Sequence, residues 1–175
     1  FGVLPPVSII EGKDVMYHFV QGFTSRLAGP EVGLEEPAAT FSACFGAPFM
    51  ALKPNVYAEL LDKKMQNNKA RCILLNTGWS GCPAGEADRM PIKITRALLD
   101  AAVSGELDNV ESEVHPVFGL RMPKSCPGVD SEMLNPRNVW KDKAAYDTAA
   151  ERLRDMFREN FKKNNFGDFG IEAVM

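Results

Sequence analysis

Apolar residues recur at helical spacing in three well-marked segments of the chain. The longest predicts a helix over about Lys143–Lys163, because apolar side chains fall on one face while charged residues occupy the others. A second helix is predicted over residues 54–65. A third is predicted over residues 97–103, where Ser104-Gly105 ends it. The apolar face of the longest helix, which we expect to be core packing, consists of Tyr146, Ala150, Leu153, Phe157 and Phe161.

The N-terminal quarter combines an extended segment, a helix and a long loop. Pro5-Pro6 removes two backbone donors and favours an extended conformation for residues 1–10. Asp14 suits the N-cap of a helix predicted over residues 15–23. His18 lies off the apolar stripe of this helix and is predicted to be a surface or capping histidine. Residues 28–39 contain two glycines and two prolines and predict a long loop. Such a loop is either a lid or a solvated connection.

Shorter apolar runs predict strands. Residues 72–75 indicate a buried strand, and the nearly continuous apolar run 41–52 indicates another, bent at Gly46-Ala47-Pro48. Partial alternation over residues 109–123 predicts one or two strands interrupted at His115-Pro116. A helix followed by a strand is the typical step of an α/β protein. We therefore predict an α/β domain over residues 1–175, with a mixed sheet and flanking helices.

Composition and charge exclude several classes of partner. The chain of 175 residues is long enough to bury a core, and its balance of 20 Lys+Arg against 23 Asp+Glu includes no run of like charges. A nucleic-acid partner would need a basic patch, and no apolar stretch approaches the length of a membrane span. The opening residues lack the charged leader of a signal peptide. The chain does not start with Met, which is consistent with a fragment or a processed product.

The cysteines and histidines do not predict a metal site. The four cysteines form no C-x-x-C pair, and the two histidines, His18 and His115, lie far apart in the sequence. Cys44 and Cys72 stand in apolar runs and are predicted to be buried. The other two, Cys82 and Cys126, stand in loops beside prolines and are predicted to be accessible thiols. No secretory feature is present, so we expect a reducing compartment and no disulfide.

The loop after the predicted strand 72–75 is the candidate functional segment. It begins Asn76-Thr77-Gly78-Trp79-Ser80-Gly81, and the run from Arg89 to Arg96 then leads into the predicted helix. A glycine-bearing loop between a strand and a helix is where α/β proteins bind ligands, and the positive N-terminal end of the helix favours anionic groups. The same arrangement can also be an ordinary connection.

Several motifs in one order resemble the ATP-dependent phosphoenolpyruvate carboxykinases. They include Asn76-Thr77-Gly78-Trp79 and the Arg-x-x-x-x-x-Thr-Arg run that starts at Arg89. The resemblance extends from residue 1 to about residue 160. Further similar segments are residues 1–8, 41–46, 127–129 and 134–138.

The resemblance implies the C-terminal, mononucleotide-binding part of the carboxykinase fold. Enzymes of this family decarboxylate oxaloacetate and transfer the γ-phosphoryl group of ATP to the enolate, with Mg²⁺ and/or Mn²⁺ as cofactors. In the family, the phosphate loop, the metal ligands and the oxaloacetate-binding arginine lie upstream of the segment resembled here. The implied partners are therefore ATP, oxaloacetate and the missing N-terminal portion. No catalytic residue and no metal ligand is expected within this chain, which should not turn over substrate alone.

The resemblance assigns an adenine pocket and a lid to this chain. Arg89 and Met90 match the family's adenine-site pair, and Thr95 matches its threonine contact. A guanidinium plane, an apolar side chain and a hydroxyl are the groups that such a pocket needs. The alternative is a helix N-terminal turn on which Arg89 and Arg96 are merely exposed. The lid corresponds to a loop at about residues 21–41, which would exclude water from the enolate.

One departure from the family pattern concerns residues 85–88. The sequence Gly85-Glu86-Ala87-Asp88 stands where the family has a glycine and a lysine before the arginine, and two added carboxylates should weaken the binding of an anion. We therefore also consider a non-catalytic structural or interaction subunit derived from the enzyme. The chain's last residues form no recognised peroxisomal signal, so the cytoplasm is the expected compartment.

Overall fold

The computed structural model of the protein describes residues 2–26, 38–81 and 89–175, and the chain forms two compact units. The first comprises Phe1–Ile10 and Ile73–Leu153, and the second comprises Glu11–Cys72 and Arg154–Met175. Each unit is therefore assembled from two stretches that are far apart in the sequence.

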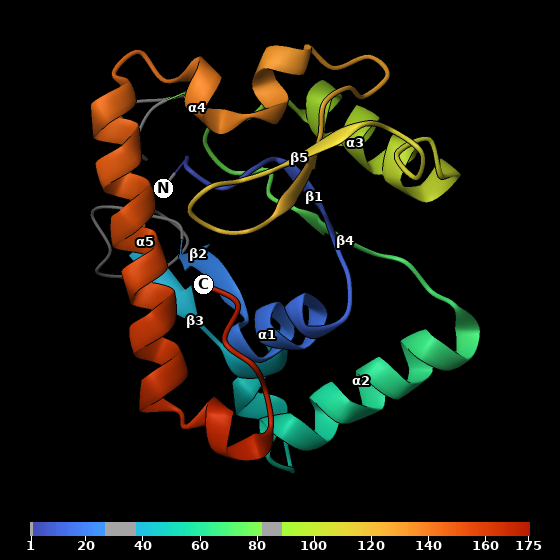
Figure 1. Ribbon diagram of the computed structural model, residues 1–175, viewed down its shortest axis with the longest axis vertical. Helices are drawn as coiled ribbons and strands as arrows, with labels where there is room; N and C mark the ends of the chain where they lie inside the picture. The colour runs from blue at the N-terminus through green and yellow to red at the C-terminus, as the bar shows by residue number, and fades with distance from the viewer. Residues whose placement is uncertain (1, 27–37, 82–88) are drawn as a thin grey trace. The chain divides into compact units, whose positions relative to one another are not determined.

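The first unit is built on a four-stranded sheet (Figure 1). Its strands are β1 (Val7–Ile10), β4 (Cys72–Leu75), β5 (Ser112–Val114) and β6 (Arg121–Pro123). The strand order is β4-β1-β6-β5, so β1 lies inside the sheet although it comes from the start of the chain. β6 is antiparallel to both neighbours, with Ile9 opposite Arg121 and Glu113 opposite Met122. The expected interruption at His115-Pro116 is confirmed, because the β5–β6 hairpin turns there.

Helix α3 (Ile92–Ser104) packs against this sheet through a hydrophobic core (Figure 1). Leu98 and Val7 are both fully buried in that core, and apolar side chains of β4 pack against it. Burying side chains of this size stabilises the fold by roughly 1.5–3 kcal/mol each. Gly105 ends the helix at φ 85°, a left-handed conformation that glycine adopts without a Cβ clash. The predicted helix and its C-terminal glycine are therefore confirmed.

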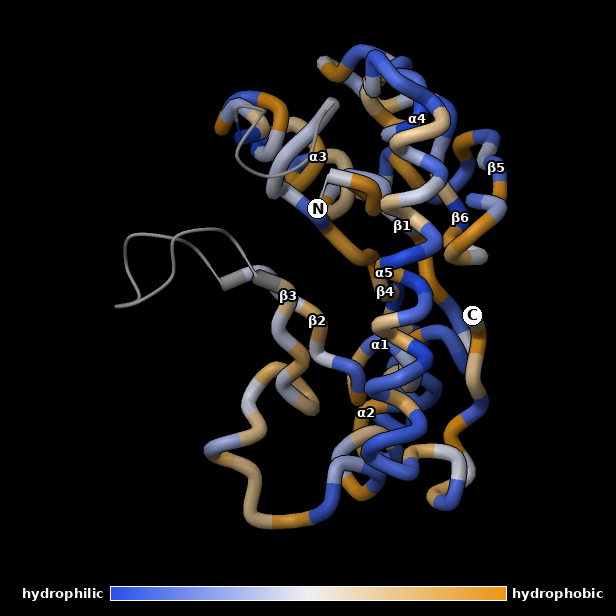
Figure 2. Tube along the Cα trace, turned by 90° about the vertical axis from the view of Figure 1, so that its left-hand side faces the viewer, coloured by the Kyte–Doolittle hydropathy of each residue, from blue (hydrophilic) through white to orange (hydrophobic). Residues whose placement is uncertain are grey.

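The segment after the hairpin forms short helices and then the longest helix of the protein. The elements are η3 (Ser131–Leu134), α4 (Pro136–Val139) and α5 (Lys143–Lys163). The bounds of α5 agree with those predicted from its apolar periodicity. Figure 2 shows it as a mainly hydrophilic helix interrupted by hydrophobic positions. Four residues of the predicted stripe are at most 1% exposed: Tyr146, Ala150, Leu153 and Phe157.

The second unit contains two helices and a two-stranded hairpin. Its elements are α1 (Lys13–Gln21), β2 (Phe23–Arg26), β3 (Ala38–Phe41), the short η1 (Ala43–Phe45) and η2 (Ala47–Phe49), α2 (Pro54–Asn68) and η4 (Phe166–Phe169). The hairpin is antiparallel, with Phe23 opposite Phe41, and their ring centroids lie 5.4 Å apart. Phe157 packs on both rings at 5.1 and 5.2 Å. Aromatic pairs at such separations stabilise the fold beyond their area burial.

The C-terminal residues are part of the second unit's core. Phe166 and Ile171 are nearly fully buried and pack with Val20 of α1 and Ala58 of α2. The tail therefore completes a core within this chain.

The predicted strand over residues 41–52 is wrong. Only Phe41 belongs to a strand, and the rest of the run forms η1, η2 and irregular chain, with Phe49 90% exposed. Cys44 and Phe45 have φ of 55° and 59°, a left-handed conformation that breaks any extended strand. The apolar composition therefore misled the prediction, because Gly46 and Pro48 stop the extended conformation rather than bend it.

Three residue-level predictions are also corrected. The N-cap of α1 is Gly12, and Asp14 lies in the first turn instead. His18 is 6% exposed rather than on the surface, because its ring packs edge-on against Tyr17 and Phe157. Cys126 is 5% exposed and belongs to the core of the first unit, so it is not an accessible thiol.

The predicted lid lies largely outside the described residues. β2 and β3 are its two arms, paired from Phe23–Phe41 to Arg26–Ala38. Residues 27–37 between them are not described. A lid role for residues 21–41 therefore stays a prediction. The departure at residues 85–88 and the thiol of Cys82 are likewise outside the described residues.

Candidate functional site

Asn76 fixes the start of the loop that follows β4. Its backbone N–H donates to the Pro6 carbonyl at 2.9 Å, and its side-chain amide donates to the Leu4 carbonyl at 3.1 Å. Both acceptors belong to the extended N-terminal segment that leads into β1. An asparagine can make both bonds at once, because its side chain carries a donor of its own. The loop therefore leaves the sheet from a fixed point.

The two described ends of the loop are joined by backbone and side-chain contacts. The Met90 N–H donates to the Gly78 carbonyl at 2.8 Å, and Trp79 and Arg89 form an antiparallel bridge. The Arg89 guanidinium carbon lies 5.9 Å from the centroid of the Trp79 ring, within the range of a cation–π interaction. Residues 76–81 and 89–90 thus form one small platform beside α3.

Gly81 lets this platform approach the end of α4. Its φ is 87°, and a Cβ built there would lie 3.2 Å from the Val139 carbonyl oxygen. A side chain would therefore meet both left-handed strain and a tight backbone contact. Gly78 differs, because a Cβ built there would lie 3.7 Å from its nearest neighbour, the Asn76 Oδ1, which is an ordinary contact distance.

The three predicted site residues lie at one junction but in different environments. Arg89 is exposed, Thr95 is partly exposed in the first turn of α3, and Met90 is 7% exposed. Met90 packs in the same core as Leu98, so it supports the junction from beneath. The N-cap of α3 is Pro91, whose carbonyl accepts from the N–H of Thr95 at 3.2 Å, and no side chain caps this helix end. An uncapped N-terminus carries a partial positive charge beside Arg89.

A second polar cluster in the first unit was not identified from the sequence. His115 and Tyr146 are each 1% exposed, and the imidazole Nε2 lies 2.6 Å from the phenolic oxygen. Burial lowers the pKa of His115 to about 4 and raises the pKa of Tyr146. A histidine that stays neutral and has all its neighbours within the fold acts as a structural link, and it offers no proton near the Arg89 platform.

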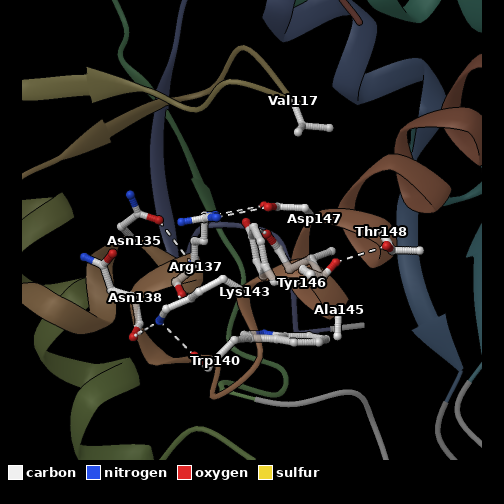
Figure 3. Close-up of polar contacts among 12 residues, drawn as sticks. Val117, Asn135, Arg137, Asn138, Trp140, Lys143, Ala145, Tyr146, Asp147 and Thr148 are labelled. Carbon is white, nitrogen blue, oxygen red and sulfur yellow. Dashed lines mark hydrogen bonds and ion pairs between the residues drawn. The ribbon is translucent and has the colours of Figure 1, made fainter.

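Figure 3 shows the polar contacts around the start of α5. The Arg137 guanidinium donates to both carboxylate oxygens of Asp147, at 2.8 and 3.0 Å. Lys143 donates to three backbone carbonyls, those of Arg137, Asn138 and Trp140, at 2.7–2.8 Å. Each charge is therefore engaged in holding α4 to α5, and these residues are structural.

The described residues do not provide a metal centre. Among residues 2–26, 38–81 and 89–175, no group of three or more His, Cys, Asp and Glu side chains could hold a metal ion. In the same ranges no helix is long and apolar enough to cross a membrane. The chemistry that these residues can offer is cationic and hydrogen-bonding, at the Arg89 platform.

The fold and the platform define an α/β protein with a candidate anion-binding loop before α3. The chain belongs to the ATP-dependent phosphoenolpyruvate carboxykinase family, because the family model described as "Phosphoenolpyruvate carboxykinase" matches residues 1–132.

Curated relatives agree with this assignment. The chain is 51% identical, over all 175 residues, to a phosphoenolpyruvate carboxykinase (ATP) of Christiangramia forsetii, of which it covers 32%. It is 55% identical to one of Pelobacter propionicus and 51% identical to one of Thermus thermophilus, each over 163 residues, or 93% of this chain and 31% of the relative. The chain therefore spans about a third of the length of these relatives.

Proposed function

We propose that this chain is the C-terminal, mononucleotide-binding part of an ATP-dependent phosphoenolpyruvate carboxykinase. The intact enzyme would convert oxaloacetate and ATP to phosphoenolpyruvate, ADP and CO₂, a step of gluconeogenesis, in the cytoplasm. Identity of 51% to a carboxykinase over the whole chain supports this reaction. The observation that carries the role within the enzyme is the platform that holds Arg89 at the uncapped start of α3.

The platform suits the adenine and ribose end of the nucleotide. The Arg89 guanidinium is exposed and planar, so it can stack on a purine ring. The Thr95 hydroxyl can donate or accept a hydrogen bond at the edge of the base or at the ribose. Met90 would supply apolar support from the core side, since 93% of its surface is already buried. The hairpin arms β2 and β3 would carry the lid.

The phosphoryl-transfer machinery is proposed to lie in the rest of the enzyme. The sequence contains no G-x-x-x-x-G-K-[ST] loop, and the described residues do not fit Mg²⁺ or Mn²⁺, which need several oxygen ligands at one place. No step through a metal ion is therefore assigned to this chain. Its residues would bind and orient ATP, while the metal would neutralise charge on the phosphoryl group at ligands elsewhere.

Two measurements test this function. First, ligand-observed NMR with millimolar ADP should detect binding to the chain, and Arg89→Ala should weaken that binding several-fold. Arg96→Ala is the matched control, because Arg96 is also exposed and lies on α3. Equal binding by all three proteins, or no binding to the unaltered chain, would contradict the nucleotide site.

Second, this chain should replace the corresponding third of the Christiangramia forsetii relative. The chimera is expected to form phosphoenolpyruvate from oxaloacetate and ATP, and Arg89→Ala in it should raise the KM for ATP more than it lowers kcat. A folded chimera that binds no nucleotide and forms no product would favour the alternative, a non-catalytic structural or interaction subunit.

A further inference from the structure

Trp79 belongs to the platform and stands in the Asn76-Thr77-Gly78-Trp79 motif, but the function proposed above assigns no separate task to its side chain. Its ring is partly buried, and its backbone forms the antiparallel bridge with Arg89. The same two residues are joined a second time, through their side chains, by the 5.9 Å separation of guanidinium and ring. The backbone bridge brings the two side chains together, and the contact between the guanidinium and the ring indicates that Trp79 helps to hold Arg89 in place.

We propose that Trp79 is the positioning residue for the adenine-binding arginine. The indole would support the Arg89 guanidinium from one side, and a purine ring would stack on the other side. This inference rests on the proposed nucleotide-binding function and extends it by one residue. The ligand class is the adenine nucleotide of the proposed function, whose flat purine ring can stack on a guanidinium.

The indole can perform this role because its own backbone is fixed. On one side of Trp79, the Gly78 carbonyl is bound by the Met90 N–H at 2.8 Å. On the other side, Gly81 holds a left-handed conformation close to Val139. Asn76 ties the start of the loop to the N-terminal segment through two hydrogen bonds. The ring therefore stands on a rigid support, as a pre-organised binding site requires.

In the part of the chain that the structure describes, the side-chain support of Arg89 comes from Trp79. The Arg89 side chain is exposed, and in the described part of the chain no carboxylate lies within ion-pair distance of it. An exposed arginine samples many rotamers, and a ligand must restrict them on binding. The cation–π contact with Trp79 restricts them in advance. At an exposed site such a contact corresponds to roughly two- to five-fold in affinity.

The decisive comparison is between two replacements of the same ring. Trp79→Leu keeps apolar bulk but removes the π face, whereas Trp79→Phe keeps a π face. In ligand-observed NMR with ADP, Trp79→Leu should bind roughly two- to five-fold more weakly than the unaltered chain, while Trp79→Phe should stay within about two-fold. Thermal unfolding of both variants checks that the fold is retained. A purely structural role would instead lower affinity in proportion to the loss of stability.

A spectroscopic measurement provides an independent readout. The chain has two tryptophans, and the indole N–H resonance that disappears in Trp79→Phe identifies Trp79. Addition of ADP should shift that resonance, and the shift should be lost in Arg89→Ala. The resonance of Trp140, whose indole N–H donates to the Gly2 carbonyl at 2.8 Å, is the internal control and should not move.

The outcomes separate this inference from the proposed function. If the unaltered chain and Trp79→Leu bind ADP equally, the positioning role of Trp79 is overturned and the nucleotide site stands. If the unaltered chain binds no ADP, both are overturned. If Trp79→Leu loses affinity and Trp79→Phe retains it, the role of the ring is established.

Discussion

The imidazole of His115 and the phenol of Tyr146 form a buried hydrogen bond of 2.6 Å whose direction is set by their other partners. The His115 Nδ1 accepts from the N–H groups of Val117 and Phe118 at 3.2 and 3.3 Å, so Nε2 carries the proton. Nε2 therefore donates to the Tyr146 oxygen, and the Tyr146 hydroxyl donates to the Val3 carbonyl at 2.9 Å. One chain of donors thus links the hairpin turn, α5 and the N-terminal segment.

Removing the Tyr146 hydroxyl should destabilise the protein. Tyr146→Phe leaves the His115 N–H and the Val3 carbonyl buried without their partner, at an expected loss of about 1–3 kcal/mol in unfolding free energy. Urea denaturation at neutral pH measures this loss. Tyr57→Phe is the matched control, because the Tyr57 hydroxyl bonds the Leu52 N–H at an exposed position. An equal loss of unfolding free energy in both variants would show that the buried hydrogen bonds of Tyr146 stabilise the protein no more than the exposed one of Tyr57.

Stability should fall as the pH is lowered through the range in which histidine titrates. Burial lowers the pKa of both His115 and His18 to about 4, against an ordinary value near 6.5. Between these values the unfolded chain binds protons that the folded chain does not. The stabilisation is therefore complete above about pH 6.5 and is lost progressively as the pH falls toward 4.

Unfolding free energies at about pH 7 and about pH 5 should thus differ by roughly 1–2 kcal/mol per histidine. This window lies above the range in which carboxylates of lowered pKa, such as Asp147, take up protons. His115→Gln should remove the contribution of His115 to this difference and leave that of His18, and His18→Gln should do the reverse. A pH difference that is unchanged in both single variants would contradict the assignment to these two side chains.

Two glycines with the same backbone conformation should respond differently to alanine. Gly22 and Gly170 have φ of 52° and 76°, but a Cβ at Gly22 would lie 1.7 Å from the Ser42 carbonyl oxygen, while Gly170 has open space. Gly170→Ala should therefore cost about 1–2 kcal/mol, the left-handed strain alone. Gly22→Ala should lower the unfolding free energy clearly more, or prevent folding, because the backbone of Ser42 must move to make room for the Cβ. Thermal unfolding of the two variants tests this order, and similar melting temperatures would contradict it.

Lys143 should matter more for stability than the ion pair beside it. Lys143→Met removes a charged donor from three carbonyls at the end of α4, with an expected loss of about 1–2 kcal/mol. Asp147→Asn breaks the exposed pair with Arg137, whose loss should be smaller and should fade at high salt. Denaturation at low and high salt separates the two. A larger effect of Asp147→Asn at high salt would overturn this ranking.

The described thiols should be slow to react in the folded protein. Burial raises the pKa of Cys44, Cys72 and Cys126, so the reactive thiolate form is rarer at neutral pH. In a Cys82→Ser chain, a disulfide reagent should label these three thiols slowly until denaturant is added. Rapid labelling of Cys126 in the folded chain would contradict its place in the core.

Periodicity predicted α3 and α5 because each buries one face of a regular repeat. The bounds of α5 followed from the spacing of Tyr146 to Phe161, and Gly105 ended α3 as expected. Composition without periodicity was a weaker guide. The run 41–52 is apolar but exposes Phe49, and the position of His18 depended on contacts with Phe157, which is far away in the sequence.

The candidate site could be predicted only as a list of residues. The motif predicted Arg89 and Thr95 as nucleotide-binding residues, and the structure places Arg89 just before α3 and Thr95 in its first turn. The sequence did not indicate that Met90 joins the core or that Trp79 contacts Arg89, because both facts depend on how the loop folds back. The His115–Tyr146 bond joins residues with no common motif, so no local signal could have revealed it.

The order of the sheet has a consequence for how the protein reaches its structure. β1 comes from the first residues of the chain, yet it separates β4 from β6, and Ile9 pairs with Arg121. During synthesis, β1 can therefore pair with β6 only after residues 121–123 have left the ribosome. Pairing over such a distance is slow, because closing a long loop is entropically costly. The side-chain bond of Asn76 to the Leu4 carbonyl likewise joins residues 72 positions apart, so the fixed start of the loop that leads to Arg89 also forms only after a long loop has closed.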